Sequence, residues 1–283
     1  MQKLEQQGFL TFAQNSEVDY LRLAYAQAMS IKLVMPDARY AVIVDEATLS
    51  EVSDRHRKIF DYVIPLPVDY AKDEEWKLAN EWQAFDLSPF KETIKVESDI
   101  LFTRSIDHWW TAFRLRDVVL SLGCRDYQGN LSQSRRYRQI FDDNSLPDTY
   151  NGLMYFRYSQ LAKDFFSTAR QIWHDWDLIT PHLTNYRDEE PSTDLVYAIA
   201  ANFIGVESCI LPECDFINFT HMKPGINGWP STPWPELVVA ETELPMVRIN
   251  NINQYHPVHY HEKSWMTNEI IEEYEQCLLK KNS

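Results

Sequence analysis

The first part of the chain alternates between short apolar runs and a stretch with helical spacing. Apolar runs over residues 8–14, 40–45 and 59–65 predict buried strands. Between the first two runs, apolar positions from Tyr20 to Ile31 recur at the spacing of a helix. Strands that alternate with helices predict an α/β fold with a mostly parallel central sheet and helices on both faces. Such sheets bind ligands at the carboxyl ends of their strands.

The remaining pattern predicts further elements around one continuous core. We expect helices over 76–86, 106–122, 159–176 and 192–203, strands over 93–102, 150–156, 209–220 and 245–249, and a loop over 123–144. An acidic, amphipathic helix within residues 262–283 forms a C-terminal helical extension. Because the chain shows no internal repeat and no break in composition, residues 1–283 are expected to form a single domain.

Acidic residues outnumber basic ones, 42 to 27, and give a net charge of −15. This balance argues against a protein that coats nucleic acid with its whole surface. The 4 cysteines form no Cys-x-x-Cys pair, which favours free thiols in a reducing cytosol. No apolar run approaches the roughly 20 residues that span a bilayer, and the first residues lack the apolar core of a signal peptide. We therefore expect a cytoplasmic protein with no membrane partner.

Two carboxylates, Glu97 and Asp99, interrupt the apolar run of the strand over 93–102. Burying unpaired carboxylates is costly, and a divalent cation resolves that cost. Mg²⁺ and Mn²⁺ prefer oxygen ligands and leave coordination positions for phosphate oxygens of a substrate. The alternative is that both acids are solvated at the end of a strand. Asp45 ends another predicted strand and is expected near the same edge.

Residues 87–102, Leu-Ser-Pro-Phe-Lys-Glu-Thr-Ile-Lys-Val-Glu-Ser-Asp-Ile-Leu-Phe, resemble the segment of GT-A-fold glycosyltransferases that carries an Asp-x-Asp motif. The glycogenin-like enzymes belong to that group, and Glu97 stands where their pattern has the first Asp. The resemblance implies a GT-A-like fold and a nucleotide-sugar donor. It also implies Mn²⁺ or Mg²⁺ held by Glu97 and Asp99. Residues 1–100 are then the nucleotide-binding half and residues 101–261 the half for the acceptor and the sugar.

Two other segments resemble parts of the same fold. Thr11-Phe-Ala-Gln-Asn is similar to its first strand, so Ala13 and Gln14 are expected to contact the nucleotide, with Asp45 nearby. Residues 149–156 resemble the strand beside the donor sugar, which places Asn151 and Gly152 against that sugar. The alternative for this Asn-Gly pair is a tight turn.

His221 and Lys223 follow the strand predicted over 209–220 and precede a loop rich in Gly and Pro. A neutral imidazole can complete a metal site begun by carboxylates, and an ammonium can contact a diphosphate. This pair resembles the His…Lys-Pro element of the glycogenin-like group. A rival lies further on, because His256, His259 and His261 could bind Zn²⁺ on their own, or one of them could replace His221 as the ligand.

A base for the acceptor hydroxyl is expected among the acids of residues 187–194. Asp194 is the first candidate and Asp188 the second. An inverting transferase needs such a carboxylate, whereas a retaining one relies on stabilising its leaving group. The alternative is that these acids favour the start of a helix through its dipole, with Ser192 or Thr193 as its cap.

Seven arginines and only three acids lie between residues 104 and 138 in an otherwise acidic chain. Arginine binds phosphate through paired hydrogen bonds, and aromatic residues in the same stretch could stack on bases. Arg125, Arg135, Arg136 and Arg138 could therefore contact DNA. The chain also resembles phage-encoded glycosyltransferases, some of which decorate hydroxylated pyrimidines in DNA. The alternative is a solvated helix face whose arginines pair with the surplus acids.

We therefore expect a metal-dependent hexosyl- or pentosyltransferase that moves a sugar from a nucleotide-sugar to a hydroxyl acceptor. A modified base in phage DNA is one candidate acceptor. A transferase that builds glycans or capsule is an alternative, and so is a sugar-nucleotide-binding protein without activity, because a fold alone does not establish catalysis.

Overall fold

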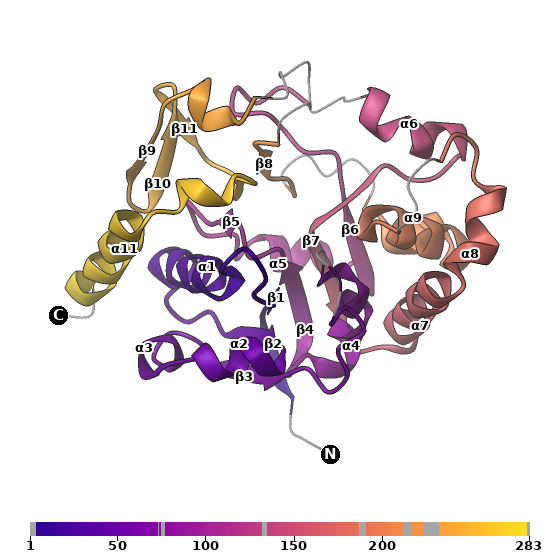
Figure 1. The fold of residues 1–283 in the computed structure, drawn as a ribbon, viewed down its shortest axis with the longest axis horizontal. Coiled ribbons are helices and arrows are strands. Elements are labelled where there is room, and N and C mark those ends of the chain that lie inside the picture. Colours follow the sequence, from indigo (N-terminus) through magenta and orange to yellow (C-terminus); the bar gives the residue numbers. More distant parts are fainter. Residues whose placement is uncertain are drawn as a thin grey trace.

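A six-stranded sheet organises the protein, and every other element packs against it or extends from it (Figure 1). The computed structural model describes residues 4–72, 74, 77–131, 135–186, 191–211, 217–223 and 232–281. The sheet has the order β3-β2-β1-β4-β7-β6. Its strands are β1 (Glu5–Ala13), β2 (Tyr40–Val44), β3 (Tyr62–Pro65), β4 (Phe90–Val96), β6 (Val118–Leu122) and β7 (Thr149–Arg157). β7 runs antiparallel to β4 and β6, and the other neighbouring strands pair in parallel. This arrangement confirms the predicted α/β fold with a mostly parallel sheet.

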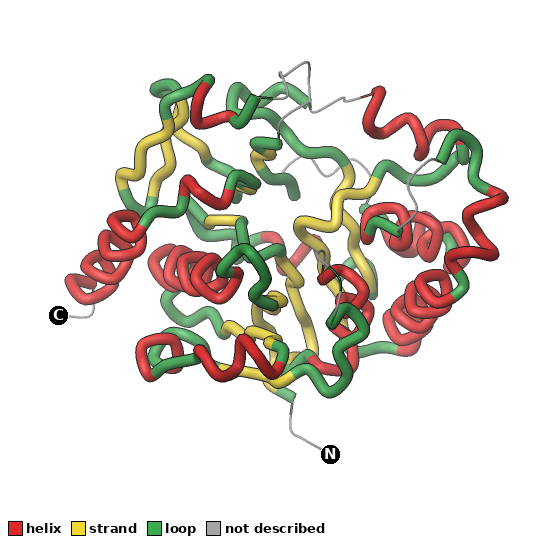
Figure 2. Tube along the Cα trace, in the orientation of Figure 1, coloured by secondary structure: helices red, strands yellow, loops and turns green. Residues whose placement is uncertain are grey.

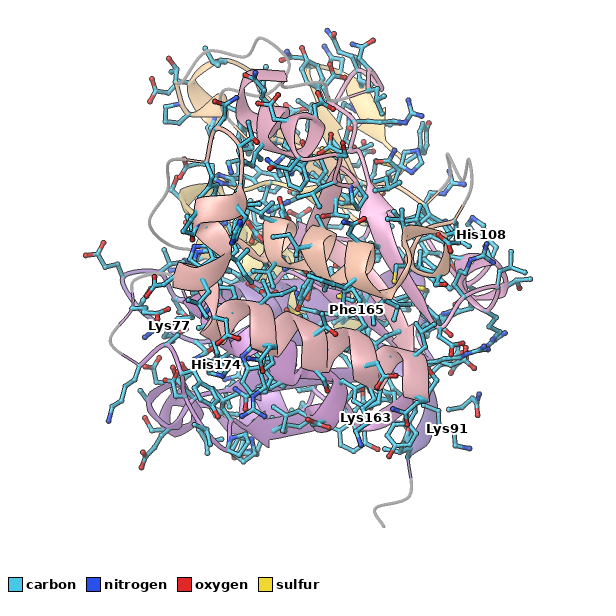
Figure 3. All side chains as sticks on the ribbon, turned by 90° about the vertical axis from the view of Figure 1, so that its right-hand side faces the viewer. Lys77, Lys91, His108, Lys163, Phe165 and His174 are labelled. Carbon is cyan, nitrogen blue, oxygen red and sulfur yellow. The ribbon has the colours of Figure 1, made fainter. Side chains whose placement is uncertain are left out.

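Helices cover both faces of the sheet (Figure 2). One face carries α1 (Tyr20–Val34), α2 (Glu46–Glu51), α3 (Asp54–Arg57), α5 (Trp109–Phe113) and α11 (Asn268–Lys281). The other carries α4 (Ala84–Leu87), α7 (Gln160–His174), α8 (Trp176–Ile179), α9 (Thr193–Ile204) and α10 (Val206–Cys209). On α7, Phe165 is buried against this second core and Lys163 is exposed (Figure 3).

The two cores follow from alternation along the strands. Phe9 of β1 and Val42 of β2 join the core beneath α1, whereas Leu10 and Ile43 join the core beneath α7. Successive side chains of a strand point to opposite faces, so a sheet covered on both sides favours apolar residues at most positions of its strands. This preference explains why the strands appear in the sequence as continuous apolar runs.

Two smaller sheets extend the fold beyond its centre. The first has the order β5-β12-β8, formed by β5 (Ile100–Leu101), β12 (Val258–His259) and β8 (Thr220–His221). The second is an antiparallel meander of β9 (Ala240–Glu243), β10 (Met246–Ile249) and β11 (Ile252–Gln254). The first sheet matters for function, because it brings three segments that are far apart in the sequence to one edge of the central sheet.

Four of the predicted segments between residues 93 and 220 differ in the structure. Residues 106–122 form α5 and then β6 instead of one helix, because Val118, Val119 and Leu120 pair with β7 inside the sheet. The strand over 93–102 is divided into β4 and β5 by a turn. The loop over 123–144 contains α6 (Arg135–Asp143), and the strand over 209–220 leaves only β8 at its end among the described residues.

The remaining differences concern short helices and the C-terminus. Short 3₁₀ helices lie at η1 (Lys77–Gln83), η2 (Thr180–His182), η3 (Trp234–Glu236) and η4 (Lys263–Trp265). The C-terminal helix begins at Asn268 and packs beside α1, where the Tyr25 hydroxyl donates to Glu275 at 2.8 Å. Within the described part of the chain, each helix is too short or too polar to cross a bilayer.

We predict that Asp61 stabilises the first half of the sheet through its charge. Its carboxylate accepts hydrogen bonds from Lys32, Arg39 and the Tyr40 amide, at 2.8, 2.6 and 2.9 Å. Burial alone would raise the pKa of Asp61, but these partners outweigh it and lower that pKa below its ordinary value. The resulting stability is therefore complete above the ordinary pKa of an aspartate and is lost as the pH falls through the lowered one.

Asp61→Asn should lower the free energy of unfolding at pH 7 by about 1–3 kcal/mol, the cost of losing bonds to a charged group. The gap between the urea unfolding curves of the two proteins should narrow as the pH falls from 5 toward 3. A gap that stays constant over this range would show that the charge of Asp61 is not what stabilises the fold.

Candidate active site

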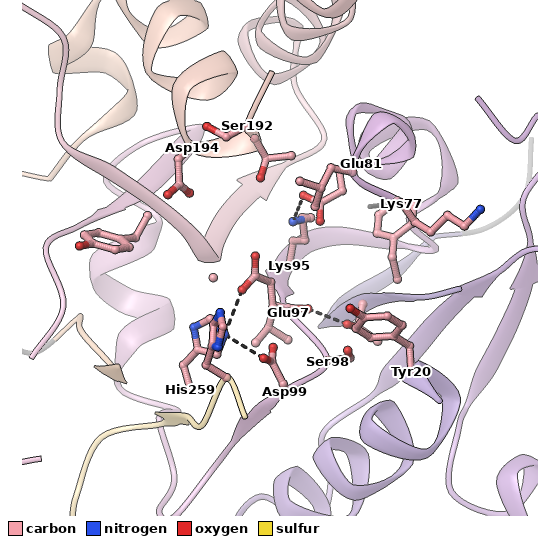
Figure 4. Close-up of a pocket in the computed structure, with 18 of the residues that line it drawn as sticks. Tyr20, Lys77, Glu81, Lys95, Glu97, Ser98, Asp99, Ser192, Asp194 and His259 are labelled. Carbon is pink, nitrogen blue, oxygen red and sulfur yellow. Dashed lines mark hydrogen bonds and ion pairs between the residues drawn. The ribbon is translucent and has the colours of Figure 1, made fainter. Parts of the chain in front are cut away.

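A cleft of about 580 Å³ opens where β1 and β4 end at the same edge of the sheet (Figure 4). Its floor comes from Thr11 and Gln14 at the end of β1 and from Glu97 just after β4. Gly152 of β7 and the beginning of α9 form one wall, and the β8 and β12 segments form another. The cleft therefore lies at the carboxyl ends of parallel strands, as the pattern of elements predicts.

The turn between β4 and β5 positions the two acids of the candidate metal site. β4 is buried up to Val96, and the chain then turns so that the Ile100 amide donates to the Glu97 carbonyl at 3.2 Å. The Glu97 amide donates to the Gly152 carbonyl at 2.9 Å, which attaches the turn to β7. Both carboxyl groups thereby line the cleft instead of continuing the strand.

Glu97, Asp99 and His259 form a set of three metal-ligating side chains, which we call the acid–histidine set. One ligand atom from each residue lies within 4.8 Å of the other two. The His259 Nε2 atom lies 3.3 Å from Glu97 Oε2 and 3.0 Å from Asp99 Oδ2 (Figure 4). Two carboxylate oxygens and one imidazole nitrogen suit Mn²⁺ or Mg²⁺ in the presence of further oxygen ligands.

Neighbouring charges keep Asp99 ionised although it is buried. Burial alone would raise the pKa of its carboxyl, but His259 and Lys263 outweigh burial and hold that pKa well below its ordinary value. Lys263 forms an ion pair with Asp99. Burial alone would lower the pKa of Lys263, but the effect of Asp99 is larger, so the net shift of this pKa is upward. Glu97 differs from Asp99, because burial raises its pKa to about 6. At neutral pH both carboxyl groups are ionised.

The structure gives His259, and not His221, the position beside the two acids. His221 lies behind His259, and the Nδ1 atoms of the two rings are 2.9 Å apart. Burial is the main reason why the pKa of His221 is well below its ordinary value, so its ring is neutral. His221 still lines the cleft, as does Lys223. The earlier expectation of His221 as a direct ligand therefore differs from the observed geometry.

The other two histidines of the C-terminal segment do not form a metal site with His259. The ring centroids of His259 and His261 are 6.0 Å apart, but His261 belongs to no group of three metal-ligating side chains in the described ranges. His256 does not line the cleft, and its carbonyl accepts from Thr103 at 3.3 Å. The acid–histidine set is the only group of three metal-ligating side chains in the described ranges, so the described residues do not support an independent zinc site.

Asn151 and Gly152 lie within β7 and not in a tight turn. Gly152 lines the cleft, and a Cβ atom at this position would lie 3.1 Å from the Phe219 ring. Asn151 is buried, and its side chain contacts Lys95 and Glu81, which form an ion pair of 2.5 Å. Gly152 is therefore held at the cleft by a regular strand, next to a buried network of charged side chains.

Asp194 lines the cleft from the first turn of α9 and is fixed by two partners. Its Oδ1 atom accepts from the Asn151 amide at 2.6 Å, and its Oδ2 atom accepts from Arg138 at 2.7 Å. Ser192 caps the helix by accepting from the Leu195 amide at 3.3 Å. The helix therefore has the expected cap at Ser192, and Asp194 lines the cleft, where its role as a base remains a prediction. Asp188, the second candidate base, lies outside the described residues.

The residues expected to contact the nucleotide are placed unequally. Gln14 lines the cleft, and it accepts from Asn80 at 3.0 Å. Ala13 is fully buried and does not line the cleft. Asp45 is also outside the lining, because its side chain caps α2 by accepting from the Thr48 amide at 2.8 Å. The structure thus gives Asp45 a structural role beside Gln14, in place of the expected position near the nucleotide.

Of the arginines expected to contact DNA, those whose side chains the structure describes bind other groups of the protein. Arg138 is buried, forms ion pairs with Asp148 and Asp194, and lies 3.9 Å from the centre of the Tyr150 ring. It is therefore not available to a polyanion, which corrects the expectation for this residue. Arg125 donates to the Gly129 carbonyl at 2.9 Å. The side chains of Arg135 and Arg136 lie outside the described structure.

Several residues of the cleft escaped the sequence analysis. Lys263 pairs with Asp99, Lys95 pairs with Glu81, and Lys77 also lines the cleft. Lys95 carries a signal in the sequence, because it interrupts the apolar run of β4 and such a charge must find a partner when the strand is buried. Lys263 had a weaker signal, its place two residues after His261.

The sequence matches no protein-family model, and a comparison with curated proteins finds no match. Solved structures do match. The galactosyltransferase LgtC, in complex with donor and acceptor sugar analogues, is 12% identical, with a TM-score of 0.52 over 94% of each chain. The active-site mutant Q189E of LgtC is 13% identical, with a TM-score of 0.54 over 96% of this chain and 95% of its own. The chain therefore has the fold of the GT-A-type glycosyltransferases.

Proposed function

We propose that the protein is a metal-dependent glycosyltransferase that moves a sugar from a nucleotide-sugar donor to a hydroxyl acceptor. One observation carries the proposal. Within a GT-A fold, the acid–histidine set lies in a cleft at the carboxyl ends of β1 and β4, where the fold can hold a nucleotide. A binding protein that needs only to hold a sugar does not require three metal-ligating side chains gathered beside lysines.

Glu97, Asp99 and His259 are the residues that would hold Mn²⁺ or Mg²⁺. Their donor atoms are of the type that these ions accept, and the two acids lie beside the ammonium of Lys263. When bound, the ion would offset negative charge on the leaving diphosphate. The proposal includes Mn²⁺ or Mg²⁺ as the ion, and it takes His259 as the third ligand in place of the expected His221.

The other residues of the cleft are proposed to bind and orient the donor. Lys263 and Lys223 reach the cleft from the C-terminal half and can contact diphosphate oxygens as point charges. Gln14 at the end of β1 contacts the nucleoside. Gly152 forms the wall beside the sugar, the buried Asn151 supports that wall from behind, and Asp194 presents its carboxylate there. Catalysis then depends mainly on positioning the reacting groups.

A hydroxyl group of a saccharide is the proposed acceptor. Aromatic rings of Tyr150, Trp173 and Phe219 line the cleft, which suits recognition of a small polar ligand with apolar faces. LgtC, whose fold this chain shares, forms a complex with donor and acceptor sugar analogues. A modified DNA base is the alternative, and it would be favoured by DNA binding that weakens steeply as salt increases.

A first prediction concerns the cation. Asp99→Asn should lower cation-dependent turnover of a nucleotide-sugar by on the order of 100-fold or more, because it removes a charged ligand and leaves Lys263 without its ion pair. Turnover is measured as release of the nucleotide from a panel of nucleoside diphosphate sugars with Mn²⁺, Mg²⁺ or EDTA. Circular dichroism checks that the variant is folded.

Asp164→Asn provides a matched control, because Asp164 is an exposed acid on α7 whose partner is Gln160. Its turnover should equal that of the wild type. Full turnover in Asp99→Asn, or turnover that EDTA leaves unchanged, would contradict the metal-dependent enzyme. Binding of a nucleotide-sugar without turnover in any combination of acceptors would instead favour a binding protein.

A second prediction separates binding from chemistry at Asp194. Asp194→Asn should lower kcat by about 100-fold, because a carboxylate that assists proton transfer contributes at least this much, and should change the Kd of the donor only a few-fold. Asp148→Asn is the control, since Asp148 pairs with the same Arg138 but does not line the cleft. Equal losses in the two variants would assign Asp194 to holding Arg138 and not to the reaction.

A further inference from the structure

His221 and His259 form a buried pair across two short strands. β8 and β12 run parallel, with His221 opposite His259 in the register. The residues are 6% and 5% exposed, and their Nδ1 atoms are 2.9 Å apart. This contact is a hydrogen bond between two ring nitrogens, so one nitrogen carries the proton and the other presents a lone pair.

The contact determines which nitrogen of His259 can bind a cation. A histidine ligand presents a lone pair, and the Nε2 atom of His259 is the atom that faces Glu97 and Asp99. A neutral imidazole with its lone pair on Nε2 carries its proton on Nδ1. That Nδ1 proton needs an acceptor in a buried site, and the Nδ1 atom of His221 is in position to accept it.

We propose that His221 is the positioning residue that holds His259 in the tautomer able to ligate the cation. The inference rests on the proposed function, because it concerns the same acid–histidine set. Partners of this kind in metal sites fix the tautomer and the ring orientation of the ligand. His221 is thus not a ligand itself but acts through His259.

The surroundings of His221 support a role through a single nitrogen. Its ring packs against Tyr150 and Phe219, with centroid separations of 5.5 and 5.9 Å. Its other nitrogen, Nε2, is buried without a hydrogen-bond partner among the described residues. An unpaired polar atom at a buried, aromatic-lined position is destabilising, and a phenylalanine would avoid that cost. The bond to His259 is the contact that a phenylalanine would lose.

The pair can change tautomer without a change in charge. When His221 donates from Nδ1, His259 can donate from Nε2 to Asp99. When His259 donates from Nδ1 to His221, its Nε2 atom is free of a proton and His221 carries a proton on Nε2. The exchange removes one proton from His259 Nε2 and adds one to His221 Nε2, while the shared proton moves between the two Nδ1 atoms.

Two substitutions test the proposal by measuring Mn²⁺ binding directly. His221→Phe keeps a ring of similar shape against Tyr150 and Phe219 but removes the acceptor. His221→Asn keeps an amide that can accept near the place of Nδ1. Free Mn²⁺ is titrated against each protein by electron paramagnetic resonance. His221→Phe should weaken Mn²⁺ binding about 10–100-fold, and His221→Asn should restore most of the lost affinity.

A spectroscopic readout reports the tautomer without reference to activity. In ¹⁵N-labelled protein loaded with Mg²⁺, His259 should show a proton on Nδ1 in the wild type and in His221→Asn. In His221→Phe the proportion of this tautomer should fall. His256→Phe is the matched control, because it makes the same substitution at a histidine outside the cleft, and it should change neither the tautomer nor the affinity.

The outcomes separate the two proposals. If wild-type protein does not bind Mn²⁺, or if Asp99→Asn binds it equally well, the proposed cation site fails. If binding depends on Asp99 but His221→Phe binds Mn²⁺ as tightly as the wild type, only the role of His221 fails. The same holds if His221→Asn is as weak as His221→Phe while both remain folded, because the loss then comes from packing.

Discussion

The ionised carboxylate of Asp99, with a side chain only 4% exposed, is the constraint on which the edge of the sheet depends. A buried carboxylate without partners would take up a proton to avoid the cost of its charge. Here Lys263 and His259 supply the partners, from 164 and 160 residues away in the sequence. The C-terminal segment must therefore fold back onto β5, and the pairing of Val258 with Leu101 and of His259 with Ile100 holds it there.

A second group of charges stabilises the opposite wall of the cleft. The Lys95–Glu81 pair contacts Asn151, and the Asn151 amide contacts Asp194, which in turn pairs with Arg138. The buried charges of this wall, Lys95, Glu81 and Arg138, each have a partner of opposite sign, which offsets much of their cost of desolvation. Removing one partner would leave a buried charge uncompensated. Ion pairs as well as packing therefore stabilise this wall.

The central elements could be predicted from the sequence because their signals are local. The apolar runs of β1, β2 and β3 and the spacing of α1 each lie within one element, and so does the acidic interruption after β4. The choice between His221 and His259 as the metal ligand cannot be made from signals within one element. It depends on the pairing of β8 with β12, two-residue strands that are too short to show a period. The local pattern predicts a helix through β6, because its apolar run lies only a few residues after α5, but pairing with β7 overrides this local preference.

The distribution of arginines shows why charge counted along a sequence differs from charge on a surface. The arginine-rich stretch of residues 104–138 is strongly basic by count, yet Arg114 pairs with Glu92 and Arg138 pairs with Asp148 and Asp194. The positive side chains that do line the cleft are lysines, Lys77, Lys95, Lys223 and Lys263, and they come from separate segments. Lysine is a compact point charge suited to phosphate oxygens that approach from different directions. Lys95 and Lys263 are themselves paired with Glu81 and Asp99, so the cleft intersperses its compact cations with acids and does not present a continuous basic face.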